Sequence, residues 1–188
     1  MPDEAQRARM ADSIEDITRT LDDILSLARV GRAGEDEREA VDITALADSV
    51  VEEFEDLGEP VTTELADGPA PRIVAAVQVT WLKRALRNLV SNAVRYGECA
   101  RVSVRREVGQ KAGVVVLSVE DDGPGIAQDD IADMLEPFTR GDVSRNRSTG
   151  GAGLGLTLAR AIAEAHGGSL KLENRKEGGL KAEIRIPA

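Results

Sequence analysis

The chain has 188 residues, of which 41% are apolar, 31% charged and only 2% aromatic, so we expect one folded unit with an aliphatic core plus an appendage. The formal net charge is -10, and residues 1–60 hold 6 Lys/Arg against 18 Asp/Glu, which argues against a nucleic acid as partner. The single cysteine, Cys99, excludes an internal disulfide, and no apolar run or leader-like segment predicts that this chain itself enters a membrane.

A heptad-like pattern predicts a helix at the start of the chain. Its apolar residues follow one another at alternating steps of four and three positions: Met10, Ile14, Ile17, Leu21, Ile24 and Ala28. Pro2 precedes this stripe, and Gly31 and Gly34 follow it. The narrow stripe predicts either packing on another helix or one half of a helical hairpin, with a homodimer through residues 4–31 as a further possibility.

Turn-forming residues and the spacing of apolar residues divide the rest of the chain into segments. Residues 32–41 are polar and charged and are expected to form a linker before a domain at 42–188. Helices are predicted at 42–57, 79–96, 128–135 and 153–166. Strands are predicted at 61–65, 72–74, 101–108, 114–120, 169–174 and 180–186. These blocks favour the α+β class: a two-layer sandwich whose mixed, mainly antiparallel sheet carries helices on one face, preceded by one long helix.

Residues 82–97 (LKRALRNLVSNAVRYG) place a polar face beside an apolar one. Asn88, Asn92 and Arg95 recur at i, i+4 and i+7, with Tyr96 at the edge of that face. The simplest interpretation is a solvated face, although asparagine within a helix costs roughly half a kcal/mol relative to alanine. Neutral amide oxygens also suit a Mg2+ ion that phosphates have already neutralised. The spacing alone leaves both interpretations open.

The stretch Val119–Ile126 (VEDDGPGI) ends an apolar run with two carboxylates and two glycines. It lacks the alternating carboxylates of a calcium loop, whereas an ordinary β-turn would use the same residue types. A buried carboxylate at the end of a strand accepts hydrogen bonds and donates none, so its natural neutral partner is an amino group such as the exocyclic amine of adenine. The second carboxylate, Asp122, is expected to face solvent.

Two neighbouring segments combine arginines with glycines. Residues 136–149 (EPFTRGDVSRNRST) form a locally basic stretch, which is either an ordinary surface loop or a loop that closes over a ligand. Residues 150–168 (GGAGLGLTLARAIAEAHGG) match neither the dinucleotide nor the P-loop pattern, but alternate glycines stand directly before a predicted helix. Free N–H groups at such a helix start attract phosphate, and a flexible linker is the alternative.

The only histidine, His166, ends the last predicted helix beside two glycines. The carbonyls of the last helical turn lack partners within the helix, and a histidine there can donate to them. We expect this structural role for His166 rather than a catalytic one.

In this order, segments 82–97, 119–126, 136–149 and 150–168 resemble the N, G1, F and G2 boxes of sensor histidine kinases. These kinases share an ATPase superfamily with gyrase, mismatch-repair ATPases and a heat-shock chaperone, and the order EPFTRGD before GGAGLGL is the feature that resembles the kinase branch. The resemblance covers about residues 42–188 and implies an ATP-binding α/β sandwich with a mobile lid.

The resemblance also implies roles for single residues. Those implied to contact the nucleotide are Asn88, Asn92, Arg95, Tyr96, Asp121, Gly123, Gly125, Ile126, Phe138, Arg140, Gly151, Gly153, Leu154, Gly155 and Leu156. Asn92 would ligate Mg2+ and would form the catalytic group with Arg95 and Arg140. Asp121 would accept from the adenine amine in a pocket lined by Tyr96. Catalysis would then consist mainly of positioning and neutralising the γ-phosphoryl group.

One departure from the family bears on activity. Residues 1–31, which end LDDILSLARVG, resemble only the second helix of the dimerisation and phosphotransfer hairpin, and the helix with the phosphoacceptor histidine has no counterpart. We therefore expect the chain to bind ATP and Mg2+ without phosphorylating itself, and to serve a hairpin of its parent kinase and, through it, a response regulator. The expected location is the cytoplasm, with the parent protein either free or anchored in the inner membrane. The alternatives are a free-standing serine or protein kinase of the same superfamily and an ATP-dependent interaction module.

Overall fold

The computed structural model describes residues 4–30, 38–64, 72–108, 113–131, 133–137 and 153–188. In chain order the elements are α1 (Glu4–Val30), β1 (Glu39–Asp42), α2 (Ile43–Asp56), β2 (Val61–Thr63), β3 (Val74–Val77), α3 (Val79–Gly97), β4 (Ala100–Val108), β5 (Gly113–Glu120), η2 (Asp133–Leu135), α4 (Gly155–Ala165), β6 (Ser169–Asn174) and β7 (Leu180–Pro187). The helices expected at 42–57, 79–96 and 153–166 are thus present, with ends that differ by two residues or fewer.

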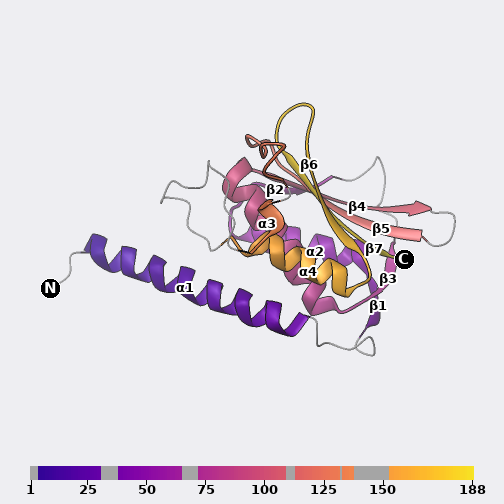
Figure 1. The fold of residues 1–188 in the computed structure, drawn as a ribbon, viewed down its shortest axis with the longest axis horizontal. Coiled ribbons are helices and arrows are strands. Elements are labelled where there is room, and N and C mark those ends of the chain that lie inside the picture. Colours follow the sequence, from indigo (N-terminus) through magenta and orange to yellow (C-terminus); the bar gives the residue numbers. More distant parts are fainter. Residues whose placement is uncertain (1–3, 31–37, 65–71, 109–112, 132, 138–152) are drawn as a thin grey trace.

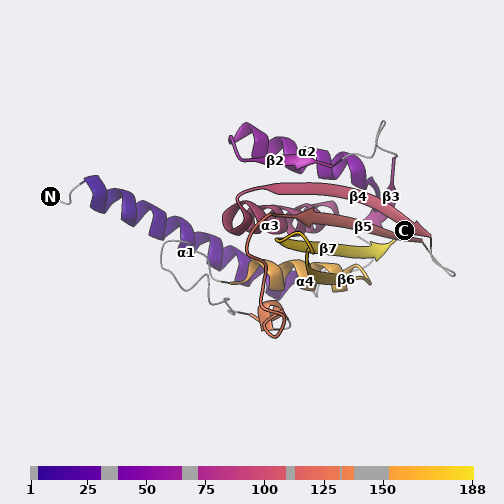
Figure 2. The same cartoon turned by 90° about the horizontal axis from the view of Figure 1, so that it is seen from above.

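Five strands form one sheet in the order β2-β4-β5-β7-β6, in which β2 and β4 run parallel and the other neighbours run antiparallel. A separate two-stranded ribbon pairs β1 with β3. Helices α2, α3 and α4 lie on one face of the large sheet (Figure 1 and Figure 2), and their apolar residues join those of the strands in one core. The expected α+β sandwich with a mixed, mainly antiparallel sheet is confirmed.

Alternation along β5 assigns the two faces of the sheet. Val115, Leu117 and Val119 are buried and belong to the core shared with the helices. The residues between them point to the opposite face, because successive side chains of a strand alternate. On that face Glu120 lies in register with Lys181, and Lys181 Nζ reaches Glu120 Oε1 at 3.1 Å.

Ion pairs cover this outer face of the sheet. They include Arg101–Asp122, Glu120–Lys181, Lys181–Glu183, Arg105–Glu183 and Arg185–Glu107. Each exposed pair adds little stability by itself. Val116 is nevertheless fully buried on this face, where it lies in register with Arg105 on one side and Arg185 on the other.

Three expectations about elements change. Residues 39–41, expected in a linker, belong to β1, and the strand expected at 72–74 lies at Val74–Val77, because these two segments pair with each other. The helix expected at 128–135 is reduced to turns and the short η2, since so short a run holds a helix only through tertiary packing. Pairing between distant segments cannot be recognised from either segment alone.

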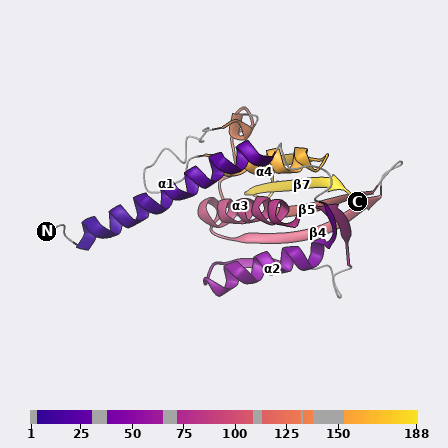
Figure 3. The same cartoon turned by 90° about the horizontal axis from the view of Figure 1, so that it is seen from below.

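The helix α1 extends away from the sandwich, and its last turns pack against α4 (Figure 3). Asp23 pairs with Arg84 of α3 at 3.0 Å, and Ser26 and Val30 are buried. The heptad stripe faces elsewhere, because Ile14 and Ile17 are 64% and 60% exposed. No helix in the described ranges is long and apolar enough to cross a membrane.

Candidate functional site

The C-terminal half of α3 faces the start of α4. Asn88 and Asn92 lie one turn apart on α3, and Asn88 Nδ2 donates to the carbonyl of Gly155 at 3.4 Å. A Cβ placed on Gly155 would lie 3.6 Å from Asn92 Nδ2. Arg95 and Tyr96 follow in the last turn of α3, where Tyr96 is 40% exposed. The fold therefore brings residues of two sequence segments, 82–97 and 150–168, into contact.

Asp121 follows β5 directly, and its residue is only 7% exposed. Its Oδ1 accepts hydrogen bonds from the backbone N–H groups of Gly123 at 2.9 Å and Leu180 at 3.0 Å. Among the described residues, none donates to Oδ2. The carboxylate is thus fixed by one oxygen, while the other oxygen keeps its capacity to accept.

Two glycines make room for this carboxylate. A Cβ on Gly97 would lie 2.5 Å from Asp121 Cγ, and a Cβ on Gly123 would lie 2.6 Å from the carbonyl oxygen of Tyr96. Real Cβ atoms do not approach so closely, so the end of α3 and the acidic loop require glycine where they touch. No role for Gly97 was predicted from the sequence, since the contact joins two segments that are separate in the chain.

The glycine-rich segment enters α4 through a left-handed residue. Gly153 has a φ of +72°, which favours glycine. The side chains of Leu154 and Leu156 are buried, and Leu156 belongs to the core, so either leucine can reach a ligand only through its backbone. The N-cap residue of α4, Leu154, makes no side-chain cap hydrogen bond, and the first N–H groups of a helix have no partner within the helix itself.

Comparison with known proteins decides the family. The family described as "Histidine kinase-, DNA gyrase B-, and HSP90-like ATPase" matches residues 77–188, a range that holds both halves of this site. The chain belongs to this ATPase family.

Relatives of this ATPase domain are sensor histidine kinases. It is 40% identical to the sensor histidine kinase GtrS of Pseudomonas aeruginosa over 149 residues, which cover 79% of this chain and 29% of GtrS. The Acinetobacter baumannii histidine kinase AdeS superimposes with a TM-score of 0.71 at 25% identity, covering 100% of this chain and 86% of that one. The ATP binding domain of PrrB from Mycobacterium tuberculosis gives a TM-score of 0.62 at 26% identity, covering 81% and 98%.

These matches confirm the expected resemblance to the ATP-binding domain of a histidine kinase. Binding of ATP follows from membership of the ATPase family. The chain spans less than half the length of the curated relatives it matches, so what a whole kinase does with that ATP is a separate question.

Asp122, the second carboxylate of the ATPase domain's acidic loop, links the end of β5 to β4 and to the turn after β6. Its side chain is 56% exposed, in keeping with the expectation that it faces solvent, but it is not unpaired. Arg101 of β4 donates to it from Nη1 and Nη2 at 2.7 and 2.6 Å, and Arg175 donates from Nη1 at 2.6 Å. These guanidinium groups hold the pKa of Asp122 well below its ordinary range.

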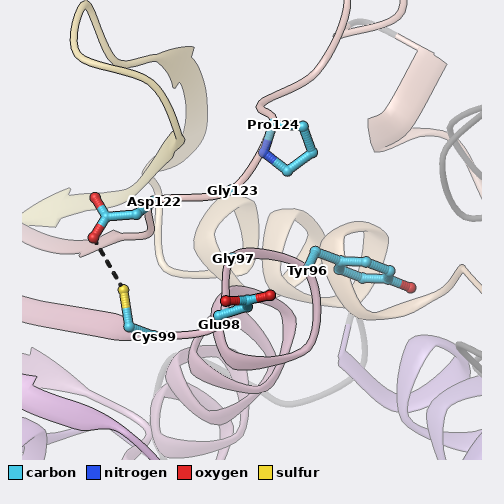
Figure 4. A pocket seen from close by; sticks show the side chains of 7 residues that line it. All are labelled: Tyr96, Gly97, Glu98, Cys99, Asp122, Gly123 and Pro124. Atoms are coloured by element: carbon cyan, nitrogen blue, oxygen red, sulfur yellow. Dashed lines mark hydrogen bonds between the residues drawn. The ribbon is translucent and has the colours of Figure 1, made fainter.

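Beside Asp122 the surface is hollowed into a pocket of about 520 Å³ (Figure 4). It is lined by Tyr96, Gly97, Glu98, Cys99, Asp122, Gly123 and Pro124. Cys99 Sγ donates to Asp122 Oδ2 at 3.3 Å, and burial together with that carboxylate raises the pKa of the Cys99 thiol. The thiol is therefore a hydrogen-bond donor in this pocket rather than a thiolate.

His166 lies at the C-terminus of α4 and is 3% exposed. Its Nε2 accepts from the backbone N–H of Gln78 at 3.0 Å, so the proton is on Nδ1, which lies 2.7 Å from the carbonyl of Ile162. Burial lowers the pKa of His166, and the charge of nearby Arg38 lowers it further. The expected contact with a terminal carbonyl is confirmed, and the bond to Gln78 at the start of α3 is an addition.

Three of the residues implied to contact nucleotide, Phe138, Arg140 and Gly151, lie outside the described residues. Of the rest, Gly125 and Ile126 follow Asp121 in the loop after β5, where Gly125 has a φ of +71°.

Two further residues, Asn174 and Arg175, were not predicted from the sequence. They contact this loop from the hairpin of β6 and β7. Neither residue stands in a motif, so only tertiary structure reveals them.

Proposed function

We propose that this ATPase domain is the catalytic domain of a sensor histidine kinase: it binds ATP with Mg2+ and transfers the γ-phosphoryl group to a histidine on a helical hairpin, from which a response regulator receives it. The observation that carries the proposal is the pair of polar ends around one glycine-lined site. At one end is a buried carboxylate with one oxygen to which no described residue donates, and at the other are amides beside the start of a helix.

The base end is built around Asp121. Its free Oδ2 suits the exocyclic amine of adenine, because a carboxylate accepts without donating. The bonds to Oδ1 from Gly123 and Leu180 keep the side chain in one orientation before a ligand arrives, which lowers the entropy lost on binding. Tyr96, at the edge of α3, would line the base pocket.

The phosphate end is built around Asn92 and the start of α4. Free N–H groups at a helix start favour phosphate oxygens, and the glycines at 153 and 155 let the backbone come close. Arg95 of α3 would contact the phosphates. Arg140, from the arginine-bearing segment 136–149, would contact them as well. Leu154 and Leu156 would contribute backbone groups while their side chains hold the loop on the core.

The Mg2+ ion fits this site as part of a nucleotide complex. In the described part of the chain, no group of three His, Cys, Asp or Glu side chains could hold a metal ion by itself. A neutral amide such as Asn92 suits an ion whose charge the phosphates balance, with Asn88 nearby. When bound, the ion would neutralise charge that develops on the phosphoryl oxygens, and the protein would supply positioning.

The phosphoacceptor is proposed to come from a hairpin of the parent kinase that docks against α1. The exposed stripe of α1 and the relatives' names as sensor kinases support this over a free-standing protein kinase or a non-catalytic interaction module. A homodimer through residues 4–31 is part of the same proposal, since an exposed heptad stripe needs a partner helix.

The proposed site is tested by titrating the 188-residue chain with a non-hydrolysable ATP analogue, with and without Mg2+. Asp121→Asn should weaken binding about tenfold or more, because an amide puts a competing donor beside the adenine amine and a hydrogen bond to a charged group contributes roughly 1.5–3 kcal/mol. Asn92→Ala should remove most of the gain in affinity that Mg2+ confers.

The control for this titration is Asp56→Asn, which makes the same chemical change at an exposed position of α2 and should bind like the unchanged chain. Unchanged affinity in both Asp121→Asn and Asn92→Ala would refute the assignment of the site. Transfer is tested separately by adding a phosphoacceptor hairpin and ATP and measuring acid-labile phosphate on the hairpin. Label on His166 of this chain instead would contradict the proposal.

A further inference from the structure

The turn between β6 and β7 packs against the loop that carries Asp121. Figure 4 shows this turn, in pale yellow, beside Asp122. Two hydrogen bonds tie the elements together: the N–H of Asp121 donates to the carbonyl of Leu180 at 3.0 Å, and the N–H of Leu180 donates to the side-chain Oδ1 of Asp121 at 3.0 Å. A Cβ on Gly179 would collide with the carbonyl oxygen of Asp121. The hairpin therefore contacts the base-recognition loop over its backbone and its carboxylate.

Asn174, the last residue of β6, binds the end of the same loop at Ile126. Its Oδ1 accepts from the N–H of Ile126 at 2.9 Å, and its Nδ2 donates to the carbonyl of Ile126 at 2.6 Å. The side-chain amide thus pairs with one residue's backbone as a neighbouring strand would. A Cβ on Gly125 would lie 2.5 Å from Asn174 Oδ1, so this pair of hydrogen bonds requires glycine at position 125.

Arg175 holds the near end of the loop. Its Nη1 donates to the carbonyl of Asp121 at 2.7 Å and to Asp122 Oδ1 at 2.6 Å, while its Nε pairs with Glu120 Oε2 at 2.9 Å. The Arg175 side chain is 18% exposed, so these bonds are partly shielded from water. Asn174 and Arg175 therefore fix the loop 121–126 at both of its ends.

We propose that Asn174 and Arg175 are positioning residues for base recognition, which aim the free oxygen of Asp121 without touching the nucleotide. The inference rests on the proposed role of Asp121 as the acceptor of the adenine amine. A loop held at both ends loses little freedom when ATP binds, whereas a loop released at Ile126 must be ordered by the ligand. The hairpin, which carries none of the four sequence motifs, thus sets the preference for an amino-bearing base.

The test compares two nucleotides on the full chain by calorimetric titration in Mg2+: an ATP analogue and its 6-deamino counterpart, a purine riboside triphosphate. The ratio of the two affinities reports the amine contact alone. Asn174→Ala should weaken ATP binding about tenfold, because the ligand must then order the released loop, and should lower the ratio. Asn174→Ser, which keeps one hydrogen-bonding group, should give an intermediate ratio and serves if the alanine variant folds poorly.

The matched control is Lys176→Ala, a truncation at an exposed position of the same turn that should leave both affinities unchanged. The double variant Asn174→Ala with Asp121→Asn should lower the ratio no further than Asp121→Asn alone, since residues that act as a unit are not additive.

Equal weakening of both nucleotides by Asn174→Ala, with an unchanged ratio, would mean that Asn174 only stabilises the fold and would overturn the inference. An Asn174→Ala chain that binds both nucleotides like the unchanged chain would overturn it as well. In either case a lowered ratio in Asp121→Asn would leave the proposed function standing. If Asp121→Asn keeps the full ratio, the adenine contact itself is wrong and the inference fails with it.

Discussion

At the scale of single residues, the end of α3 places a glycine and a left-handed residue at two different positions, Gly97 and Glu98. The left-handed residue after α3 is Glu98, with a φ of 62°, and not the glycine before it. Gly97 is kept free of a side chain for another reason, the close approach of Asp121. The demands of the site therefore take precedence over the usual placement of glycine in a helix cap.

These two positions should respond oppositely to substitution. Glu98→Gly should stabilise the chain by roughly 0.5–1 kcal/mol, because glycine adopts a left-handed conformation without the cost that other residues carry. Gly97→Ala should destabilise it by about 1–3 kcal/mol through overpacking against Asp121, despite the better helix propensity of alanine. Urea unfolding of both variants measures the two signs. Stabilisation by Gly97→Ala would show that the contact with Asp121 is not close.

At the scale of elements, the end of α4 is joined to the start of α3 by one imidazole. His166 bonds to Ile162 in its own helix and to Gln78, the residue that precedes α3. The two helices supply the asparagines and the glycine-rich start that form the proposed phosphate end of the site. The neutral ring at their opposite ends therefore contributes to how they are aligned.

The neutral state of His166 predicts a pH dependence of stability. Because burial lowers its pKa in the folded chain below the ordinary value of 6.5, the unfolded chain binds more protons in this range. The contribution is fully present above about pH 6.5, near the reference pKa of histidine, and is lost as the pH falls through the folded pKa.

Urea unfolding between pH 8 and pH 5 measures this effect, with His166→Gln as comparison. The variant should be less stable at neutral pH and should lose less stability on acidification. Carboxylates with lowered pKa, such as Glu183, act at lower pH, below their ordinary value of 4.5. A parallel decline in both chains above pH 5 would contradict the role given to His166.

At the scale of the whole molecule, α1 presents two faces to different surroundings. Asp23, Ser26 and Val30 contact the sandwich, whereas Ile17 and Leu21 of the heptad stripe are 60% and 55% exposed. A contiguous apolar stripe on a long helix is typical of an interface with another helix. The proposed ATP site lies on other elements, so association through α1 should not depend on nucleotide.

We expect the chain to self-associate through this stripe in sedimentation experiments as its concentration rises. The double variant Ile17→Glu with Leu21→Glu should sediment as a monomer, because a dimer would have to bury the new charges in its interface. It should bind the ATP analogue normally. Arg19→Glu adds negative charge at another exposed position of α1 and is the control. A chain that is monomeric at every concentration would remove the homodimer from the proposal and leave the hairpin as the partner.

Periodicity and punctuation predicted the main features of the fold from the sequence. The valine-rich run at 114–120, the apolar stripe of α3 and the abrupt helix after Gly155 are local patterns, and they are strong because one face of each element is buried. The ribbon of β1 and β3 was missed because each strand has four residues and is defined by the other.

The sequence by itself determined the class of fold, through the spacing of its apolar residues, and it indicated the family through the order of its four motifs. Only the tertiary structure decided how the site is held together. Gly97 against Asp121, Asn174 on Ile126 and Arg175 on the carbonyl of Asp121 join residues far apart in the chain. Such contacts leave no local pattern, since they depend on where the fold places the end of α3 and the β6–β7 hairpin beside the loop after β5.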